Sequence, residues 1–402
     1  MICLSLTAKL KGAVAAHSAT APIFNEESRR GKVLCMKRRE GEAREALRQY
    51  SNQSTAHQNN FNLIRLVGAL LVMIGHMGPI MGIQTPVMGQ DMHGIGVEIL
   101  FLIGGYLITE SWMHDPNPLR YGIRRFFRLW PPFAVMTLIM TFLAGPLLSN
   151  LGVDGYYGSW WSEYLKNLRF YIIYAQPGVF TDAPIPYVTN GSLWTMPVEL
   201  VLYIITPIFI ELFRIRKIKN SGLLSVLGIL ILISIGAWLE SQDDLHWIFY
   251  ATEWATALRL GIFFFIGMLC TLKPIQKCFD LQWAPIAFLA IILVNHVTRT
   301  TQYIVMTIAL PYLVFSLALA PNPKFFRIGT KYELSYGVYL YGFFFQQLVL
   351  YFQNRIGQNW GFAWTLIVSL CLTIVTAWLN SVLIEKPIQK LSKKLMVNLK
   401  SY

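Results

Sequence analysis

Apolar stretches of about 20 residues, the length that crosses roughly 30 Å of hydrocarbon, recur along almost the whole chain after residue 60. The chain has 402 residues, of which 54% are hydrophobic and only 14% charged. This balance is far from that of a soluble protein. The stretches are also too long and too continuous for the alternating strands of a membrane barrel. We therefore predict an all-α, polytopic integral membrane protein.

Ten transmembrane helices account for these stretches. We expect them at residues 61–83, 93–113, 127–149, 193–213, 222–239, 254–272, 282–298, 302–320, 333–352 and 362–384. Most of the 34 Lys and Arg residues then lie in the two terminal segments and in every second loop, which the positive-inside rule assigns to the cytoplasm. We predict that both termini are cytoplasmic and that the protein lies in the cytoplasmic (inner) membrane. The same asymmetry explains the net charge of +13 without nucleic-acid binding.

Three segments follow from this topology. Residues 1–60 form a basic cytoplasmic segment, residues 61–386 a transmembrane domain, and residues 387–402 a basic cytoplasmic tail. Translation could also start at Met36, in which case residues 1–35 are an incorrect extension. The five cysteines show neither CxxC nor Cys/His spacing, so we predict no disulfide and no metal site.

The longest external segment, about residues 150–192, is rich in Trp and Tyr. Such aromatic side chains typically anchor a segment at the membrane interface. A surface on which sugar rings stack is the second interpretation. Both stay open at this point.

The first span carries two ionisable residues, Arg65 and His76. Placing an ionisable side chain inside the membrane costs free energy, so each is a candidate functional residue. They are eleven residues apart, so they share one helix face and lie about 16 Å from each other along the axis. Between them, Gly68, Ala69 and Val72 leave room for a neighbouring helix or a long thin ligand. His76 is a candidate catalytic base, and a structural histidine is the alternative.

The fourth span carries Glu199 at a depth similar to that of His76. Tyr203 lies one turn further on the same face, within a polar stripe that extends to Thr206. Glu199 could contact His76 or, alternatively, pair with Arg259 of the sixth span. Together with Glu98 of the second span, Arg259 and Tyr203 are possible additional polar site residues.

Arginines cluster at the cytoplasmic start of the third span, where Arg125 and Arg128 lie at a depth similar to that of Arg65. Membrane anchoring is one explanation for such a cluster. A phosphate site is the other, because guanidinium groups match phosphate geometry.

Six stretches in the same order resemble the acyltransferase family 3 membrane proteins, which include O-antigen and exopolysaccharide O-acetylases. They are RLVGALLVMIGH at 65–76, GVEILFLIGGYLI at 96–108, RRFFRLWPPF at 124–133, LWTMPVELVLYIITP at 193–207, SYGVYLYG at 335–342 and EKP at 385–387. The resemblance covers about residues 60–390. Three features depart from the family pattern: Glu98 replaces its usual aspartate, Gly104-Gly105 replaces its Ser-Gly pair, and Gly342 replaces a later histidine.

The resemblance implies transfer of an acyl group, acetyl in the families named, from acetyl-CoA to a hydroxyl of an envelope glycan or lipid-linked sugar. We expect no permanently bound cofactor; acetyl-CoA or another acyl-CoA is the donor substrate. His76 is then the general base and Glu199 the residue that orients it. Arg65, Arg125 and Arg128 hold the donor's phosphates.

Two other functions remain open. A transporter or flippase for a lipid-linked glycan also needs about ten spans, but the sequence lacks the inverted repeats typical of such proteins. The other is a structural or regulatory membrane protein, and in such a protein His76 and Glu199 would have no evident role.

Overall fold

The computed structural model describes residues 59–83, 86–87, 90–213, 215–218, 222–242, 246–294, 298–320 and 332–400. All of them belong to one compact unit, Asn59–Tyr402. This unit is almost entirely helical, and its two sheets, β1–β2 and β3–β4, are hairpins of two-residue strands. The predictions for the N-terminal segment, including the start at Met36, lie outside the described residues.

The first half of the described chain contains the helices around which the candidate site is built. Its elements are α3 (Phe61–Ile80), β1 (Pro86–Val87), β2 (Gln90–Asp91), α4 (Met92–His114), α5 (Pro118–Ile139), the π-helical turn Met140–Ala144, α6 (Gly145–Leu148), α7 (Gly152–Tyr157), the 3₁₀ segments Trp161–Arg169 and Gly191–Trp194, and α8 (Thr195–Leu212).

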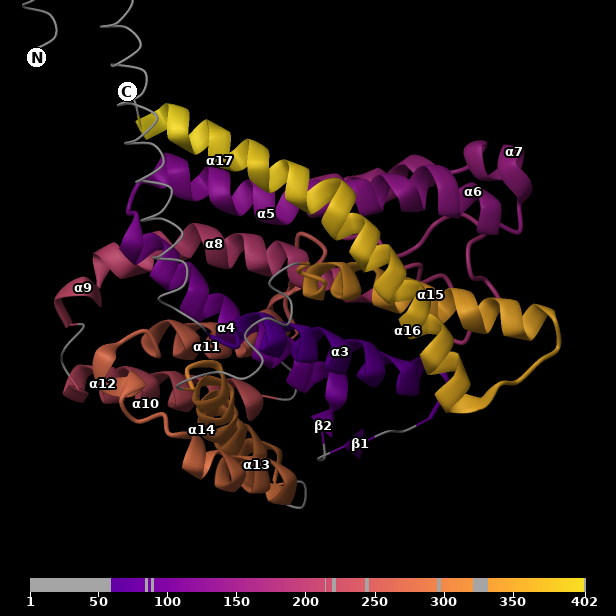
Figure 1. Cartoon of the computed structure of the whole chain (residues 1–402). Helices are drawn as coiled ribbons and strands as arrows, with labels where there is room; N and C mark the ends of the chain where they lie inside the picture. The colour runs from indigo at the N-terminus through magenta and orange to yellow at the C-terminus, as the bar shows by residue number, and fades with distance from the viewer. Residues whose placement is uncertain are drawn as a thin grey trace, which may run out of the picture. The chain divides into compact units, whose positions relative to one another are not determined.

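The second half adds a group of packed helices and two long C-terminal ones (Figure 1). Its elements are α9 (Ile215–Ile218), α10 (Gly222–Glu240), β3 (Ile248–Phe249), β4 (Thr252–Glu253), α11 (Trp254–Leu269), α12 (Lys273–Gln276), the 3₁₀ turn Leu281–Trp283, α13 (Ala284–Leu293), α14 (Arg299–Ala318), α15 (Ser335–Arg355), α16 (Gly361–Asn380), the π-helical turn Ser381–Glu385 and α17 (Lys386–Lys400).

Each predicted span coincides with a helix, but not all of these helices have membrane-spanning length. Among the described residues, seven helical segments are long and apolar enough to cross a membrane; they are Phe61–Ile80, Met92–His114, Pro118–Leu148, Gly191–Leu212, Gly222–Glu240, Arg299–Ala318 and Gly361–Met396. The apolar helices Trp254–Leu269 and Leu281–Leu293 are shorter. A polytopic, all-α membrane architecture is therefore supported, and the count of ten stays a prediction.

Helix α15 has 21 residues but is not one of these seven segments, and it carries buried amides among its apolar side chains. Gln346, Gln347 and Gln353 are at most 2% exposed. Each amide nitrogen has a partner: Gln346 donates to the Met73 carbonyl oxygen at 2.6 Å, and Gln353 donates to Thr365 at 3.0 Å. Such interhelical hydrogen bonds hold a helix among other helices without a wholly apolar surface.

Helix α3 packs against α4 on one side and α15 on another (Figure 1). Glycines permit the contact with α4, because a Cβ atom on Gly96 would lie 2.5 Å from the Gly68 carbonyl oxygen. On the α15 side, Ala69 packs with Val338. Gly68, Ala69 and Val72, which were predicted to leave room for a helix or a ligand, thus pack against neighbouring helices.

Two tyrosines of the aromatic segment after α6 point into the protein. Tyr156 and Tyr164 are fully buried, whereas Trp160 is 47% exposed. The Tyr156 hydroxyl donates to the Thr141 carbonyl oxygen at 2.9 Å and accepts from the Gln176 amide at 3.1 Å. Packing against α5 therefore accounts for part of this aromatic content.

Candidate active site

His76 lies near the C-terminal end of α3, enclosed by aromatic rings of two other helices. Its imidazole stacks on that of His93 in α4, with ring centroids 4.9 Å apart and an interplanar angle of 21°. The ring of Phe343 in α15 meets it edge-on, with centroids 5.4 Å apart. Three helices thus contribute one ring each to this cluster, which we call the histidine cluster.

Gly75 makes the histidine cluster possible. A Cβ atom at this position would lie 2.1 Å from the backbone nitrogen of His93, closer than any real contact. Only glycine therefore lets the start of α4 approach α3 closely enough for the two imidazoles to stack. His93 was not among the predicted site residues; the available signal was a histidine at the very start of the next span.

Glu199 lies on α8 and accepts a hydrogen bond from the Tyr203 hydroxyl one turn along the helix. The predicted polar stripe thus brings these two side chains together. The cations that act electrostatically on Glu199 are Arg128, Arg125 and Arg65. In the described part of the chain, no hydrogen bond joins Glu199 to His76, so the expected direct contact between them is not present in this structure.

Arg65 and Arg128 meet at the opposite end of α3, where both form ion pairs with Glu333. The Arg65–Glu333 distance is 2.7 Å. Arg128 also reaches Glu385 at 3.4 Å, and Glu385 accepts from Asn380 at 2.8 Å. We call Arg65, Arg128, Glu333 and Glu385 the arginine–glutamate cluster. Its two cations and two carboxylates leave it formally neutral.

Glu333 was not among the predicted site residues. It lies two residues before SYGVYLYG, and a carboxylate at the first position of a predicted span was the only available signal. The structure makes it the residue that joins two of the three arginines predicted to bind the donor.

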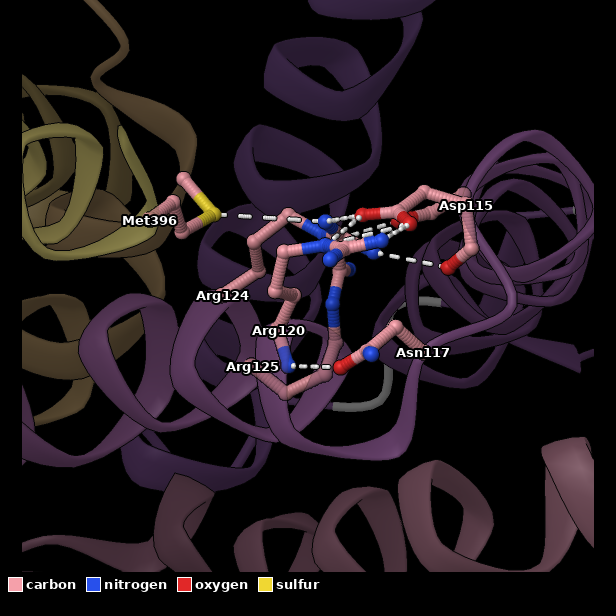
Figure 2. A network of polar contacts seen from close by, with 7 residues as sticks. Asp115, Asn117, Arg120, Arg124, Arg125 and Met396 are labelled. Atoms are coloured by element: carbon pink, nitrogen blue, oxygen red, sulfur yellow. Dashed lines mark hydrogen bonds and ion pairs between the residues drawn. The ribbon is translucent and has the colours of Figure 1, made fainter. Parts of the chain in front are cut away.

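Two further arginines of α5 are held by the connection between α4 and α5 (Figure 2). Arg120 and Arg124 both form ion pairs with Asp115, and the Asn117 side chain caps the helix by accepting from the Arg120 backbone N–H at 3.0 Å. The hydrogen bond from Arg120, supported by Arg124, holds the pKa of the Asp115 carboxyl well below its usual range. These two arginines are thus committed to a structural role.

Arg125 differs from its neighbours. Its guanidinium donates to the Ser111 hydroxyl at 3.2 Å and lies over the rings of Tyr121 and Tyr203, each 5.7 Å from the guanidinium carbon. In the part of the chain that the structure describes, no carboxylate forms an ion pair with it. It is close to the arginine–glutamate cluster but does not share its carboxylates.

Arg259 and Glu98 belong to another part of the molecule. Arg259 forms an ion pair with Glu240 of α10 at 3.3 Å and donates to the Leu239 carbonyl oxygen at 3.0 Å. The alternative in which Arg259 neutralises Glu199 is therefore wrong for this structure. Glu98 is only 9% exposed, and the charge that acts on it is that of Glu240.

Within the described ranges, no group of three His, Cys, Asp or Glu side chains lies close enough together to bind a metal ion.

Comparisons with known proteins identify the family. An acyltransferase domain model (Acyl_transf_3) matches residues 58–382. Nodulation protein 10 of Rhizobium leguminosarum bv. viciae is 29% identical over 376 residues, which are 86% of this chain and 97% of that protein. The O-acetyl transferase of Shigella phage Sf6 is 26% identical over 338 residues, 82% of this chain and 96% of that protein. No solved structure matches.

The family match extends over the histidine cluster and over Arg65, Arg128 and Glu333 of the arginine–glutamate cluster, and it confirms the resemblance drawn from the sequence motifs. The chain belongs to the acyltransferase family 3 and is an acyltransferase with several helices of membrane-spanning length.

Proposed function

We propose that the protein transfers an acetyl group from cytoplasmic acetyl-CoA to a hydroxyl of an envelope carbohydrate, free or lipid-linked, at the outer face of the cytoplasmic membrane. Relatives named as an O-acetyl transferase and, over 40% of this chain, as a peptidoglycan O-acetyltransferase of Listeria monocytogenes support this class of reaction. The observation that carries the proposal is the division of α3: arginines lie at one end, and a histidine enclosed by aromatic rings lies at the other.

His76 acts as the general base in this proposal. It takes the proton of the acceptor hydroxyl while the oxygen attacks the thioester carbonyl. The new C–O bond forms, the C–S bond breaks, and the proton passes to the departing thiolate of coenzyme A. A positioned base of this kind typically contributes about 10²- to 10⁴-fold to the rate.

Arg65 and Arg128 bind phosphates of the donor. Both already face an anion, Glu333, and a phosphate can take over the guanidinium hydrogen bonds that this carboxylate accepts. Because the cluster is formally neutral, donor binding requires Glu333 to move aside or to give up one arginine. Arg125, the third arginine predicted for the donor, has a different environment, against the rings of Tyr121 and Tyr203.

Glu199 orients His76 in our proposal. Its present hydrogen bond comes from Tyr203, so this role requires the two side chains to approach each other or to meet through the acceptor hydroxyl. A carboxylate in that position stabilises the imidazolium that forms during proton transfer.

Mass spectrometry of the envelope polysaccharide tests the function. Cells that lack the gene should lose the mass increment of an acetyl ester, and the wild-type gene should restore it, whereas the His76→Ala variant should not. Unchanged polysaccharide in the deletion strain would contradict the proposal and favour the transporter hypothesis.

Cysteine labelling in intact cells tests the orientation. We expect single cysteines at Gln90 and Gln358 to react with a membrane-impermeant reagent, and one at Lys394 to stay unlabelled until the cells are opened. Labelling of Lys394→Cys from outside would reverse the topology and remove acetyl-CoA as the donor at the arginine end of α3.

A further inference from the structure

A cavity of about 530 Å³ lies between α5 and α8, beside the end of α4. Aromatic and aliphatic side chains form nearly all of its wall, among them Tyr121, Phe126, Trp130, Tyr203 and Ile208. The charged side chains in its lining are Arg125 and Glu211. We call it the α5–α8 pocket.

The α5–α8 pocket is bounded by side chains that face away from the protein. Phe126 is 49% exposed, Ile204 58% and Ile208 60%. All three lie inside helical segments of membrane-spanning character, Pro118–Leu148 and Gly191–Leu212. In a bilayer, such side chains contact lipid hydrocarbon, so the pocket is reached from the side of the membrane.

Arg125 supplies this apolar pocket with a cation that forms no ion pair with a carboxylate of the described chain. Arg120 and Arg124 share Asp115, and Arg128 pairs with Glu333. Arg125 instead has the Ser111 hydroxyl and two tyrosine rings, and its buried Nε has no hydrogen-bond partner.

Glu211, the other charged residue of the pocket, accepts a hydrogen bond from the Trp112 indole at 2.9 Å. It lies more than two turns beyond Tyr203 on α8, whereas Arg125 lies directly against the Tyr203 ring. Of the two charged residues in the lining, Arg125 is therefore the one that lies against Tyr203.

We propose that the α5–α8 pocket binds one anionic phospholipid, with its phosphate at the Arg125 guanidinium and an acyl chain along the apolar wall between α5 and α8. A guanidinium in an apolar surrounding binds a phosphate through charge-assisted hydrogen bonds. Arg125 is about 10 Å along α5 from Pro118, a depth that a headgroup at the membrane surface reaches. The polar nucleotide of coenzyme A is a poor match for a pocket that opens to hydrocarbon.

The bound lipid would also influence the candidate active site. Tyr203 belongs to both, because its ring lines the pocket and its hydroxyl donates to Glu199. An occupied pocket would hold Tyr203, and with it the Glu199 carboxyl, in one position. The lipid site itself does not depend on which acceptor the enzyme uses.

Native mass spectrometry of the full-length protein in mild detergent tests this inference directly. With phosphatidylglycerol and phosphatidylcholine of the same chain length as probes, the wild type should retain one phosphatidylglycerol several-fold better than phosphatidylcholine. Arg125→Gln should lose the preference because the phosphate partner is gone. Gly122→Leu should weaken retention of both lipids, since a Cβ at Gly122 has nothing within 4 Å and the new side chain fills the pocket.

Two matched controls should behave like the wild type. Arg124→Gln removes a neighbouring positive charge that is paired with Asp115, and Leu138→Trp adds bulk to a 41% exposed position of α5 outside the pocket lining. Equal retention of phosphatidylglycerol in the wild type, Arg125→Gln and Gly122→Leu would overturn the inference. So would a loss of coenzyme A binding in Arg125→Gln with unchanged lipid retention, which would assign Arg125 to the donor.

Discussion

The two ends of α3 carry polar residues of opposite character. At Arg65, three ion pairs link two cations and two carboxylates. At His76, the ring contacts are with another imidazole and a phenylalanine. The first arrangement can exchange one anion for another, whereas the second places aromatic rings around a proton-transfer group. The comparison suggests that one helix serves donor binding at one end and chemistry at the other.

The largest effect is expected from His76→Ala. Loss of the base should reduce acetyl transfer by about 10²-fold or more. The variant should reach normal membrane levels, because alanine is tolerated in an apolar helix. Immunoblotting of membranes and the polysaccharide assay measure the two quantities, and transfer near the wild-type rate would remove chemistry from this end of α3.

Glu333→Gln should destabilise the protein, since Arg65 and Arg128 would lose their common carboxylate. We expect a loss of about 1–3 kcal/mol, less than for a fully buried pair, because these side chains are roughly a quarter exposed. If phosphate replaces the carboxylate, coenzyme A should raise the melting temperature of the variant more than that of the wild type. Equal shifts would argue against a donor site at this cluster.

Glu199→Gln should reduce transfer by about tenfold, because an amide can orient a ring but cannot stabilise an imidazolium. The double variant with His76→Ala should be scarcely slower than His76→Ala alone, as for residues that act as a unit. Additive losses in this double-mutant cycle would show that the two side chains act independently.

His93→Phe should have the smallest effect. Phenylalanine preserves ring stacking on His76, a contact worth about 0.5–1.5 kcal/mol, so we expect a reduction in kcat of less than about tenfold. His93→Ala, which removes the ring, should be slower than His93→Phe. Equal rates for both variants would limit His93 to a packing role without influence on His76.

Much of this architecture could be predicted from the sequence because membrane spans and functional charges leave local signals. All ten predicted spans coincide with helices, and Arg65 and Arg128 meet as their depths suggested. The amides of α15 show where apolarity fails as a guide, since a helix enclosed by others can satisfy polar groups through tertiary contacts.

The contacts between helices could not be predicted in the same way. Glu333 comes from a segment far from Arg65 and Arg128 in sequence, and the approach of His93 to His76 depends on backbone packing at Gly75. The pairing of Arg259 with Glu240 is equally a matter of which helices become neighbours. Helix periodicity gives the face of a residue but not the identity of the helix that it meets.

Steady-state kinetics with acetyl-CoA as the varied substrate test the division of α3 most directly. Arg65→Lys keeps the charge but loses the bidentate guanidinium, so it should raise the KM for acetyl-CoA about tenfold with little change in kcat. His76→Gln should do the reverse, with kcat reduced by about 10²-fold or more and an almost unchanged KM. If both variants changed the same parameter to the same extent, the two ends of α3 would not divide donor binding from chemistry, and the account would be contradicted.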